Sequence, residues 1–189
     1  MTEWILASGS PRRRQLLEQI GDTVRVQPVS VDEAALPGES APDLVRRLAR
    51  AKAAAIPSGP GARLPVLAAD TVVVVAGAIL GKPADDAEAA AMLRRLAGRE
   101  HQVWTGICLR LADGAEHVCA EMTRVWFAPM TGAEIAAYIA TGEPRDKAGA
   151  YGIQGPAAQF IPRIEGSYSN VMGLPLHRVR AMARAAGLG

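Results

Sequence analysis

The sequence predicts an α/β fold with a mixed twisted β-sheet flanked by helices. Apolar segments with helical spacing are interspersed with short β-branched runs along the whole chain. The pair Asp113-Gly114 lies between two such runs, which is typical of an antiparallel hairpin. The chain has 189 residues, of which 49% are hydrophobic and 21% charged. This size and composition predict one globular domain over residues 1–189, with or without two lobes.

The first half of the chain supplies helices and strands in alternation. In order, we expect a strand over residues 4–7, a helix over 12–20, a strand over 24–29, a helix over 44–55 and a strand over 65–69. Gly21 should stop the first helix, and the run from Pro57 to Gly61 is a break before the next strand.

The second half is expected to begin with an apolar run that turns back on itself. That run covers residues 71–80, with Ala76-Gly77 as the turn. A helix over 86–97, strands over 103–111 and 117–127, a helix over 131–140 capped by Thr131, a loop over 142–155 and a final helix over 175–186 should follow.

Charge, cysteine content and hydropathy exclude several classes of protein. A formal net charge of +2 is too small to indicate a nucleic-acid binder. The longest apolar run, Val72–Leu80, is too short to span a bilayer, and the N-terminus lacks the features of a signal peptide. Two cysteines cannot make a four-cysteine zinc site. A hairpin centred on Asp113-Gly114 would put Cys108 opposite Cys119, and we expect both to be reduced thiols in a soluble cytoplasmic protein.

The segment after the first strand has the features of a phosphate site. Ser10 is a good N-cap, and Pro11 suits the first position of a helix. Free backbone N–H groups and the positive end of the helix dipole therefore point at the small residues Ser8 and Gly9. Cations in a first helical turn, here Arg12 and Arg13, destabilise the helix unless an anion binds there. The alternative is a capped surface helix that happens to begin with arginines.

A second candidate site centres on Asp70, which lies within an apolar run. Burying an unpaired carboxylate is costly, so Asp70 needs a partner. If the hairpin is symmetric about Ala76-Gly77, Thr71 lies opposite Lys82, and Lys82 becomes a close neighbour of Asp70. The alternative is a buried ion pair that closes the edge of a sheet.

A third candidate is the glycine-rich segment from Asp146 to Gly155. Within it, the side-chain amide of Gln154 offers both a donor and an acceptor, which suits the edge of a nucleobase. A glycine-rich turn without any ligand is the alternative explanation.

Several of these segments, in this order, resemble the Maf family of nucleotide pyrophosphatases. The resemblance runs nearly from end to end, which makes it far more specific than any one motif. It rests on residues 6–13 (LASGSPRR), 69–72 (ADTV), 81–83 (GKP), 101–106 (HQVWTG), 146–151 (DKAGAY) and 166–176 (GSYSNVMGLPL). Met172 stands where the family usually has an aliphatic β-branched residue, which should not affect the chemistry.

The resemblance implies a fold like that of the inosine triphosphatases, with two lobes around a cleft. It implies hydrolysis of a nucleoside triphosphate to the monophosphate and pyrophosphate, a divalent cation (Mg²⁺ or Mn²⁺) as cofactor, a possible homodimer, and an association with cell division arrest and septum formation. Ile153-Gln154-Gly155 resembles the branch that hydrolyses dTTP and UTP, and the expected substrate range extends to modified pyrimidine nucleotides. Arg12, Thr71 and Gln154 match the positions that the resemblance associates with pyrimidine choice.

The resemblance also adds Glu33 and Lys52 to the candidate site. Without it, Glu33 would be interpreted as a solvated acid and Lys52 as a surface lysine. We then expect Glu33 and Asp70 to hold the metal and Asp70 to act as general base. Thr71 and Gln154 are expected to contact the nucleobase of the substrate. The side chains expected around the phosphates are those of Ser8, Ser10, Arg12, Arg13, Lys52 and Lys82.

Two other functions fit the same residues. One is the 7-methyl-GTP branch of the family, which typically has a glutamate near Gln154, or a broader activity on modified nucleotides. The other is a non-enzymatic nucleotide-binding inhibitor of cell division. Glu33 and Asp70 argue against a pure anion binder, because carboxylates repel phosphates unless a metal intervenes.

Overall fold

A computed structural model describes residues 2–57 and 64–188. Its strands form a mixed sheet in the order β2-β1-β3-β5-β6-β7, and β4 pairs with β3. The chain divides into two compact units: unit 1 holds residues 1–70, 105–121 and 173–189, and unit 2 holds 71–104 and 122–172. Strands β3 (Val66–Val75), β5 (Glu100–Arg110) and β6 (Glu116–Trp126) each contribute residues to both units. The expected α/β class with a mixed sheet is confirmed, while one domain and a cleft stay predictions.

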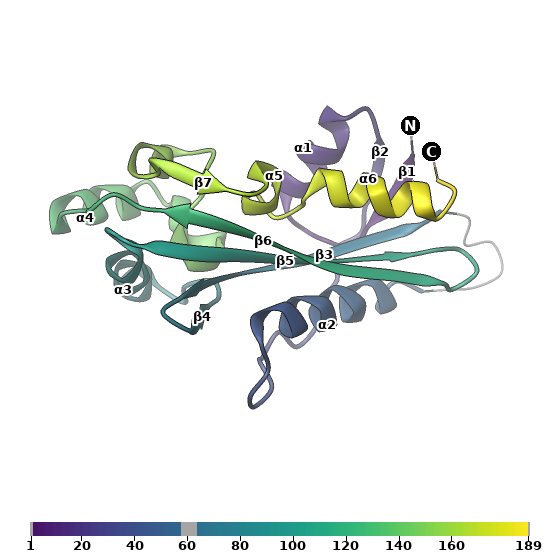
Figure 1. Cartoon of the computed structure of the whole chain (residues 1–189), viewed down its shortest axis with the longest axis horizontal. Coiled ribbons are helices and arrows are strands. Elements are labelled where there is room, and N and C mark those ends of the chain that lie inside the picture. The colour runs from purple at the N-terminus through teal and green to yellow at the C-terminus, as the bar shows by residue number, and fades with distance from the viewer. Residues whose placement is uncertain (1, 58–63, 189) are drawn as a thin grey trace. The chain divides into compact units, whose positions relative to one another are not determined.

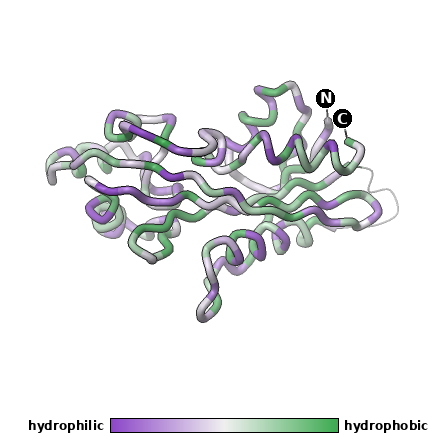
Figure 2. Tube along the Cα trace, in the orientation of Figure 1, coloured by the Kyte–Doolittle hydropathy of each residue, from purple (hydrophilic) through white to green (hydrophobic). Residues whose placement is uncertain are grey.

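Unit 1 is built on parallel strands. β1 (Glu3–Leu6) pairs in parallel with β2 (Thr23–Val26) on one side and with β3 on the other. Its helices are α1 (Pro11–Gln19), α2 (Ala41–Ala54) and α6 (Leu176–Ala185). Helices α2 and α6 lie on opposite faces of the strands (Figure 1). The strands are mostly hydrophobic, whereas α2 alternates hydrophobic and hydrophilic residues, as expected for a helix with one buried face (Figure 2).

Unit 2 has a core of its own around the second half of β3. That core gathers buried side chains of β3, β4, α3, β5, β6 and α4, among them Val73, Leu93, Val125 and Tyr138. The elements that lie wholly in this unit are β4 (Ala78–Leu80), α3 (Asp86–Leu96), α4 (Gly132–Ala140), β7 (Arg163–Glu165), α5 (Tyr168–Val171) and three 3₁₀ helices, η1 (Glu143–Asp146), η2 (Ala148–Ala150) and η3 (Pro156–Phe160).

The expected helices and longer strands are all present, with ends that differ by a few residues. The sequence interpretation missed β7 and α5, which are only three and four residues long and carry no periodic signal. It also treated as a loop the segment that forms η1 and η2. The predicted break at Pro57–Gly61 lies outside the described residues after position 57. Among the residues that the structure describes, no helix combines the length and hydropathy needed to cross a membrane.

The predicted pairing of Cys108 with Cys119 is wrong. The Leu111 N–H donates to the Ala115 carbonyl, and the Phe127 N–H donates to the Arg99 carbonyl, so the hairpin is centred on Asp113 and not between Asp113 and Gly114. This one-residue change of register moves the two cysteines to opposite faces of the sheet. Cys108 packs in the cluster that includes α2, and Cys119 Sγ lies 3.4 Å from the sulfur of Met182 on α6. Both are free thiols, and burial raises the pKa of each.

Candidate active site

The parallel strands of unit 1 bring three predicted site segments to one edge. Parallel strands all end at the same edge of a sheet, which is where open α/β sheets bind ligands. Ser8 to Ser10 follow β1, and Glu33 lies in the segment after β2. Asp70 lies on β3 beyond Leu67, the last residue that pairs with β1. The topology thus brings Ser8 to Ser10, here called the serine loop, and both predicted metal ligands to the carboxyl edge of the sheet.

The serine loop leads into α1 as the sequence predicts. Ser10 is the N-cap residue in extended conformation, Pro11 begins the helix, and the Ser10 side chain makes no capping hydrogen bond. The Ser10 N–H instead donates to Ser8 Oγ at 3.2 Å. Gly9 is exposed, and a Cβ added to it would meet only Pro28, at an ordinary contact distance of 3.7 Å. Packing within the protein therefore leaves room for a side chain at Gly9.

Arg13 ties this loop to the end of β3. Its guanidinium donates to Ser8 Oγ at 3.0 Å, to the Ala69 carbonyl at 2.8 Å and to the Gly173 carbonyl at 2.8 Å. Burial lowers the pKa of Arg13, and the opposing effect of Asp70 is next in size. Arg13 is only 9% exposed, whereas Arg12 beside it is half-buried. The structure thus makes Arg13 a link between segments, next to the acid at Asp70.

Lys52 forms ion pairs with both acidic residues of the predicted site, Glu33 and Asp70. It lies on α2 at the spacing of the buried residues Leu48 and Ala49, so its position on the helix points into unit 1. Lys52 Nζ lies 2.6 Å from Asp70 Oδ1 and 2.5 Å from Glu33 Oε1. Lys52 and Asp70 are almost fully buried, and the Glu33 side chain is 46% exposed. The interpretation of Lys52 as a surface lysine is wrong, and a charged residue on the apolar stripe of a helix was the available signal.

Gly106 on β5 determines how closely α2 approaches the sheet. A Cβ at this position would overlap the backbone carbonyl of Val45, which lies on α2 seven residues before Lys52. Only glycine allows the helix backbone to come this near. Gly106, at the end of the 101–106 motif, thereby allows α2 to lie close enough to the sheet for Lys52 to contact Asp70.

The residues present suit a divalent cation. Glu33 Oε1 and Asp70 Oδ1 both lie within 2.6 Å of one cationic nitrogen, so the two carboxylates already share one position for positive charge. Mg²⁺ is usually held by one or two carboxylates together with waters and substrate phosphates. Over residues 2–57 and 64–188, no group of three or more histidine, cysteine or acidic side chains is placed to hold a metal.

Unit 2 holds Thr71, Lys82 and Gln154. The β3–β4 hairpin pairs Val73 with Leu80 and turns at Ala76 and Gly77, which both have positive φ, so the predicted turn and register are confirmed. The ladder ends at Leu80, and Lys82 is exposed. Within unit 1, the ammonium group that bonds Asp70 comes from Lys52, and the expectation that Lys82 neighbours Asp70 stays a prediction.

Gln154 is exposed on a turn between two buried residues, Ile153 and Ala157. The segment before this turn is joined to the hairpin, because the Gly149 N–H donates to the Gly81 carbonyl at 2.9 Å. Gly149 has a φ of +68°, and a Cβ there would lie 2.8 Å from a methyl group of Val73. Gly149 thus has a packing role in addition to turn formation.

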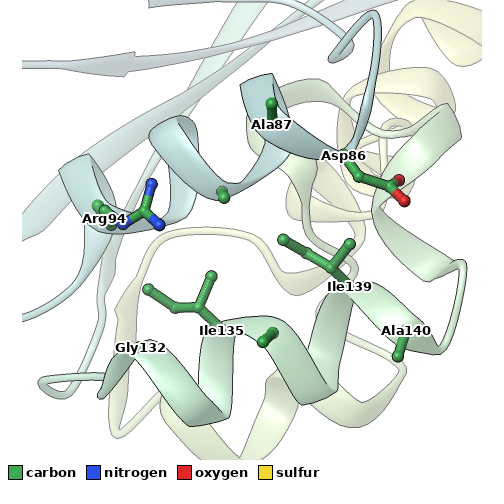
Figure 3. A pocket seen from close by; sticks show the side chains of 9 residues that line it. Asp86, Ala87, Arg94, Gly132, Ile135, Ile139 and Ala140 are labelled. Atoms are coloured by element: carbon green, nitrogen blue, oxygen red, sulfur yellow. The ribbon is translucent and has the colours of Figure 1, made fainter.

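The same unit contains a cavity of about 480 Å³ between α3 and α4. Its wall is mostly apolar, with Ile135 and Ile139 facing α3 and with Asp86 and Arg94 as its charged members (Figure 3). None of the predicted site residues lines it.

Known proteins resemble this chain over nearly its whole length. The model of the family described as "Maf-like protein" matches residues 3–186. The chain belongs to the Maf family. A protein of Methylobacillus flagellatus named dTTP/UTP pyrophosphatase is 52% identical over 100% of this chain and 94% of its own length. A protein of the same name from Symbiobacterium thermophilum is 54% identical over 99% of this chain and 95% of its own.

A solved structure supports the fold alone. The Staphylococcus aureus Ham1 protein superposes on this Maf family member with a TM-score of 0.55 at 16% sequence identity. The match covers 98% of this chain and 100% of that one. The names of the sequence relatives, and not this structural likeness, agree with the activity expected from the sequence.

Proposed function

We propose that this Maf family member is a nucleoside triphosphate pyrophosphatase that hydrolyses dTTP and UTP to the monophosphate and pyrophosphate. The observation that carries the proposal is the convergence of Glu33 and Asp70 on one cation position at the carboxyl edge of the parallel strands. The relatives named dTTP/UTP pyrophosphatase are 52% and 54% identical to this chain over nearly its full length, which supports dTTP and UTP as its substrates.

The residues of unit 1 supply the chemistry of bond cleavage. A water attacks the α-phosphorus, the bond from that phosphorus to the bridging oxygen breaks, and pyrophosphate leaves with the bond electrons. Asp70 accepts the proton of the water. Because Asp70 Oδ1 is bonded to Lys52, Oδ2 is the proposed acceptor atom. Lys52 and Arg12 bind phosphate oxygens, and the exposed backbone at Gly9 lets the phosphate chain approach the start of α1.

Arg13 and Ser8 have a supporting part in this proposal. The hydrogen bonds from Arg13 to Ser8 Oγ and to the Ala69 carbonyl fix the serine loop against the strand that carries Asp70. Ser10 contributes its hydroxyl and its place at the N-terminus of α1, where phosphate is favoured by the helix dipole.

Glu33 and Asp70 would hold Mg²⁺ or Mn²⁺, which neutralises charge on the phosphates when it is bound. In unit 2, Lys82 binds a phosphate oxygen, while Thr71 and Gln154 contact the pyrimidine. The exposure of Lys82 and Gln154 is consistent with ligand-binding roles. Assembly as a homodimer and a place in the cytoplasm stay predictions, which gel filtration and cell fractionation would test.

The decisive experiment is product analysis. The purified full-length chain is incubated with UTP, dTTP, GTP and 7-methyl-GTP, with Mg²⁺ or Mn²⁺ or with EDTA, and pyrophosphate and orthophosphate are measured separately. We expect pyrophosphate from dTTP and UTP in the presence of metal only. Release of orthophosphate, a preference for 7-methyl-GTP, or binding without turnover would each contradict the proposal.

A further inference from the structure

The turn that carries Gln154 rests on two side chains outside the predicted site, the buried Tyr138 and the half-buried Glu143. Tyr138 lies on α4 and is only 3% exposed, and Glu143 begins η1. The Gly152 N–H donates to the Tyr138 hydroxyl at 3.2 Å. The backbone at Gly152 is thus fixed by a buried phenol.

Glu143 also touches the other end of the turn. A Cβ at Gly155 would overlap the Glu143 carboxylate, and a Cβ at Gly152 would lie 3.1 Å from Glu143 Oε1. The Gly155 N–H donates to the Gly152 carbonyl at 3.2 Å, so the turn closes on itself above the acid. Both glycines that bracket Gln154 therefore pack directly against this carboxylate, and the exposed amide of Gln154 stands on a rigid base.

The chemistry of the pair is suited to holding a backbone. Burial first, and the Glu143 carboxylate second, raise the pKa of the Tyr138 phenol, so it stays protonated. Glu143 Oε2 is buried and has no hydrogen-bond partner within the described part of the chain. Loss of the phenol hydroxyl would leave the Gly152 N–H without the acceptor that fixes it.

We infer that Tyr138 and Glu143 are positioning residues for base selection, because they hold the Gly152–Gly155 turn so that Gln154 meets the pyrimidine. This inference rests on the proposed function, in which Gln154 contacts the base. Neither Tyr138 nor Glu143 touches the substrate in this scheme. Their effect should therefore appear in the choice between nucleotides and not in the rate of bond cleavage.

The test is the discrimination ratio, which we define as kcat/KM for UTP divided by kcat/KM for GTP, in the full-length chain. The folded fraction cancels in this ratio, so a loss of stability alone does not change it. Tyr138→Phe should lower the ratio about fivefold, the effect of one ordinary hydrogen bond, mainly through a higher KM for UTP. Tyr168→Phe, at an exposed tyrosine of the same unit, is the matched control and should leave the ratio unchanged.

Two further variants separate positioning from a general structural role. Glu143→Gln keeps the shape of the side chain that packs against Gly152 and Gly155 and should retain most of the discrimination, whereas Glu143→Ala should behave like Tyr138→Phe. In a Gln154→Ala background, Tyr138→Phe should cause no further change in the ratio, because its effect passes through Gln154.

An unchanged ratio in Tyr138→Phe, or an equal fall in the Gln154→Ala background, would overturn the inference and leave the proposed function standing. Absence of pyrophosphate from UTP and dTTP in the wild-type protein would instead overturn the proposed function, and the inference with it.

Discussion

Lys52 Nζ and Asp70 Oδ1 lie 2.6 Å apart, in an ion pair whose two side chains are each about nine-tenths buried. Glu33 adds a second carboxylate to the same ammonium. A buried charge is stable only with its partners, so any change in this trio alters both stability and chemistry. The first two predictions concern its members.

Asp70→Asn should abolish most of the turnover. Loss of the proposed general base typically lowers kcat by about 10²- to 10⁴-fold. The variant should still fold, because Lys52 keeps Glu33 as a partner. Pyrophosphate release and a thermal unfolding curve on the same sample measure both effects. A near-normal kcat in a folded variant would remove Asp70 from the role of base.

Lys52→Met should make stability depend on metal. Without the ammonium, the buried Asp70 carboxylate loses the cation of its ion pair, which typically costs about 3–5 kcal/mol. Mn²⁺ held by Glu33 and Asp70 should restore part of this loss, so the variant should gain more in unfolding temperature from Mn²⁺ than the wild type does. Thermal unfolding in EDTA and in Mn²⁺ measures this difference. An equal response to Mn²⁺ in both proteins would argue against a metal at these carboxylates.

Two glycine-to-alanine changes should separate ligand approach from packing. Gly9→Ala meets no close neighbour and should change the free energy of unfolding by no more than about 0.5 kcal/mol, yet raise the KM for the triphosphate. Gly106→Ala overlaps the Val45 carbonyl and should destabilise the fold by roughly 1–3 kcal/mol or more. Chemical denaturation and steady-state kinetics measure the two effects. If Gly9→Ala kept the wild-type KM, phosphate would not approach the backbone at this residue.

Stability should fall in mild acid because of His101. Burial lowers the pKa of His101 to about 4 in the folded protein, against about 6.5 when unfolded. As the pH falls below 6.5, His101 becomes protonated in the unfolded chain, whereas in the folded chain it stays neutral down to about pH 4. The free energy of unfolding should therefore decrease over this window, by up to roughly 3 kcal/mol.

Denaturation at a series of pH values measures the loss due to His101. The decrease should be smaller in His101→Gln and preserved in His177→Gln, where the side chain is 54% exposed. The same slope in all three proteins would assign the acid sensitivity to other groups.

Gln154→Glu should change substrate choice more than folding. Gln154 is exposed, so the substitution should alter the free energy of unfolding by no more than about 0.5 kcal/mol. A carboxylate at this position cannot donate to a pyrimidine carbonyl, so kcat/KM for dTTP and UTP should fall. Kinetics with dTTP, UTP and 7-methyl-GTP measure the change. Equal rates in both proteins would remove Gln154 from base recognition.

Local patterns in the sequence predicted much of the fold and the first candidate site. The N-cap at Ser10, the start of α1 at Pro11 and the turn at Ala76-Gly77 depend on the residues themselves and their near neighbours. The register of the longer β5–β6 hairpin was missed by one residue, because the loop around Asp113 closes on an odd number of residues. Composition cannot reveal the number of residues in this loop, although that number decides which face of the sheet each cysteine occupies.

Residue patterns along the chain predict the α/β class, the alternation of elements, the small-residue loop before α1 and, through the motifs, the family. They do not predict which cation meets Asp70, because that partner is Lys52, which is 18 residues away along the chain and on a different element. Nor do they predict that Arg13 is buried against Ala69 or that Tyr138 and Glu143 support the Gln154 turn. These contacts arise because parallel pairing and close helix packing join distant segments, and no local spacing encodes them.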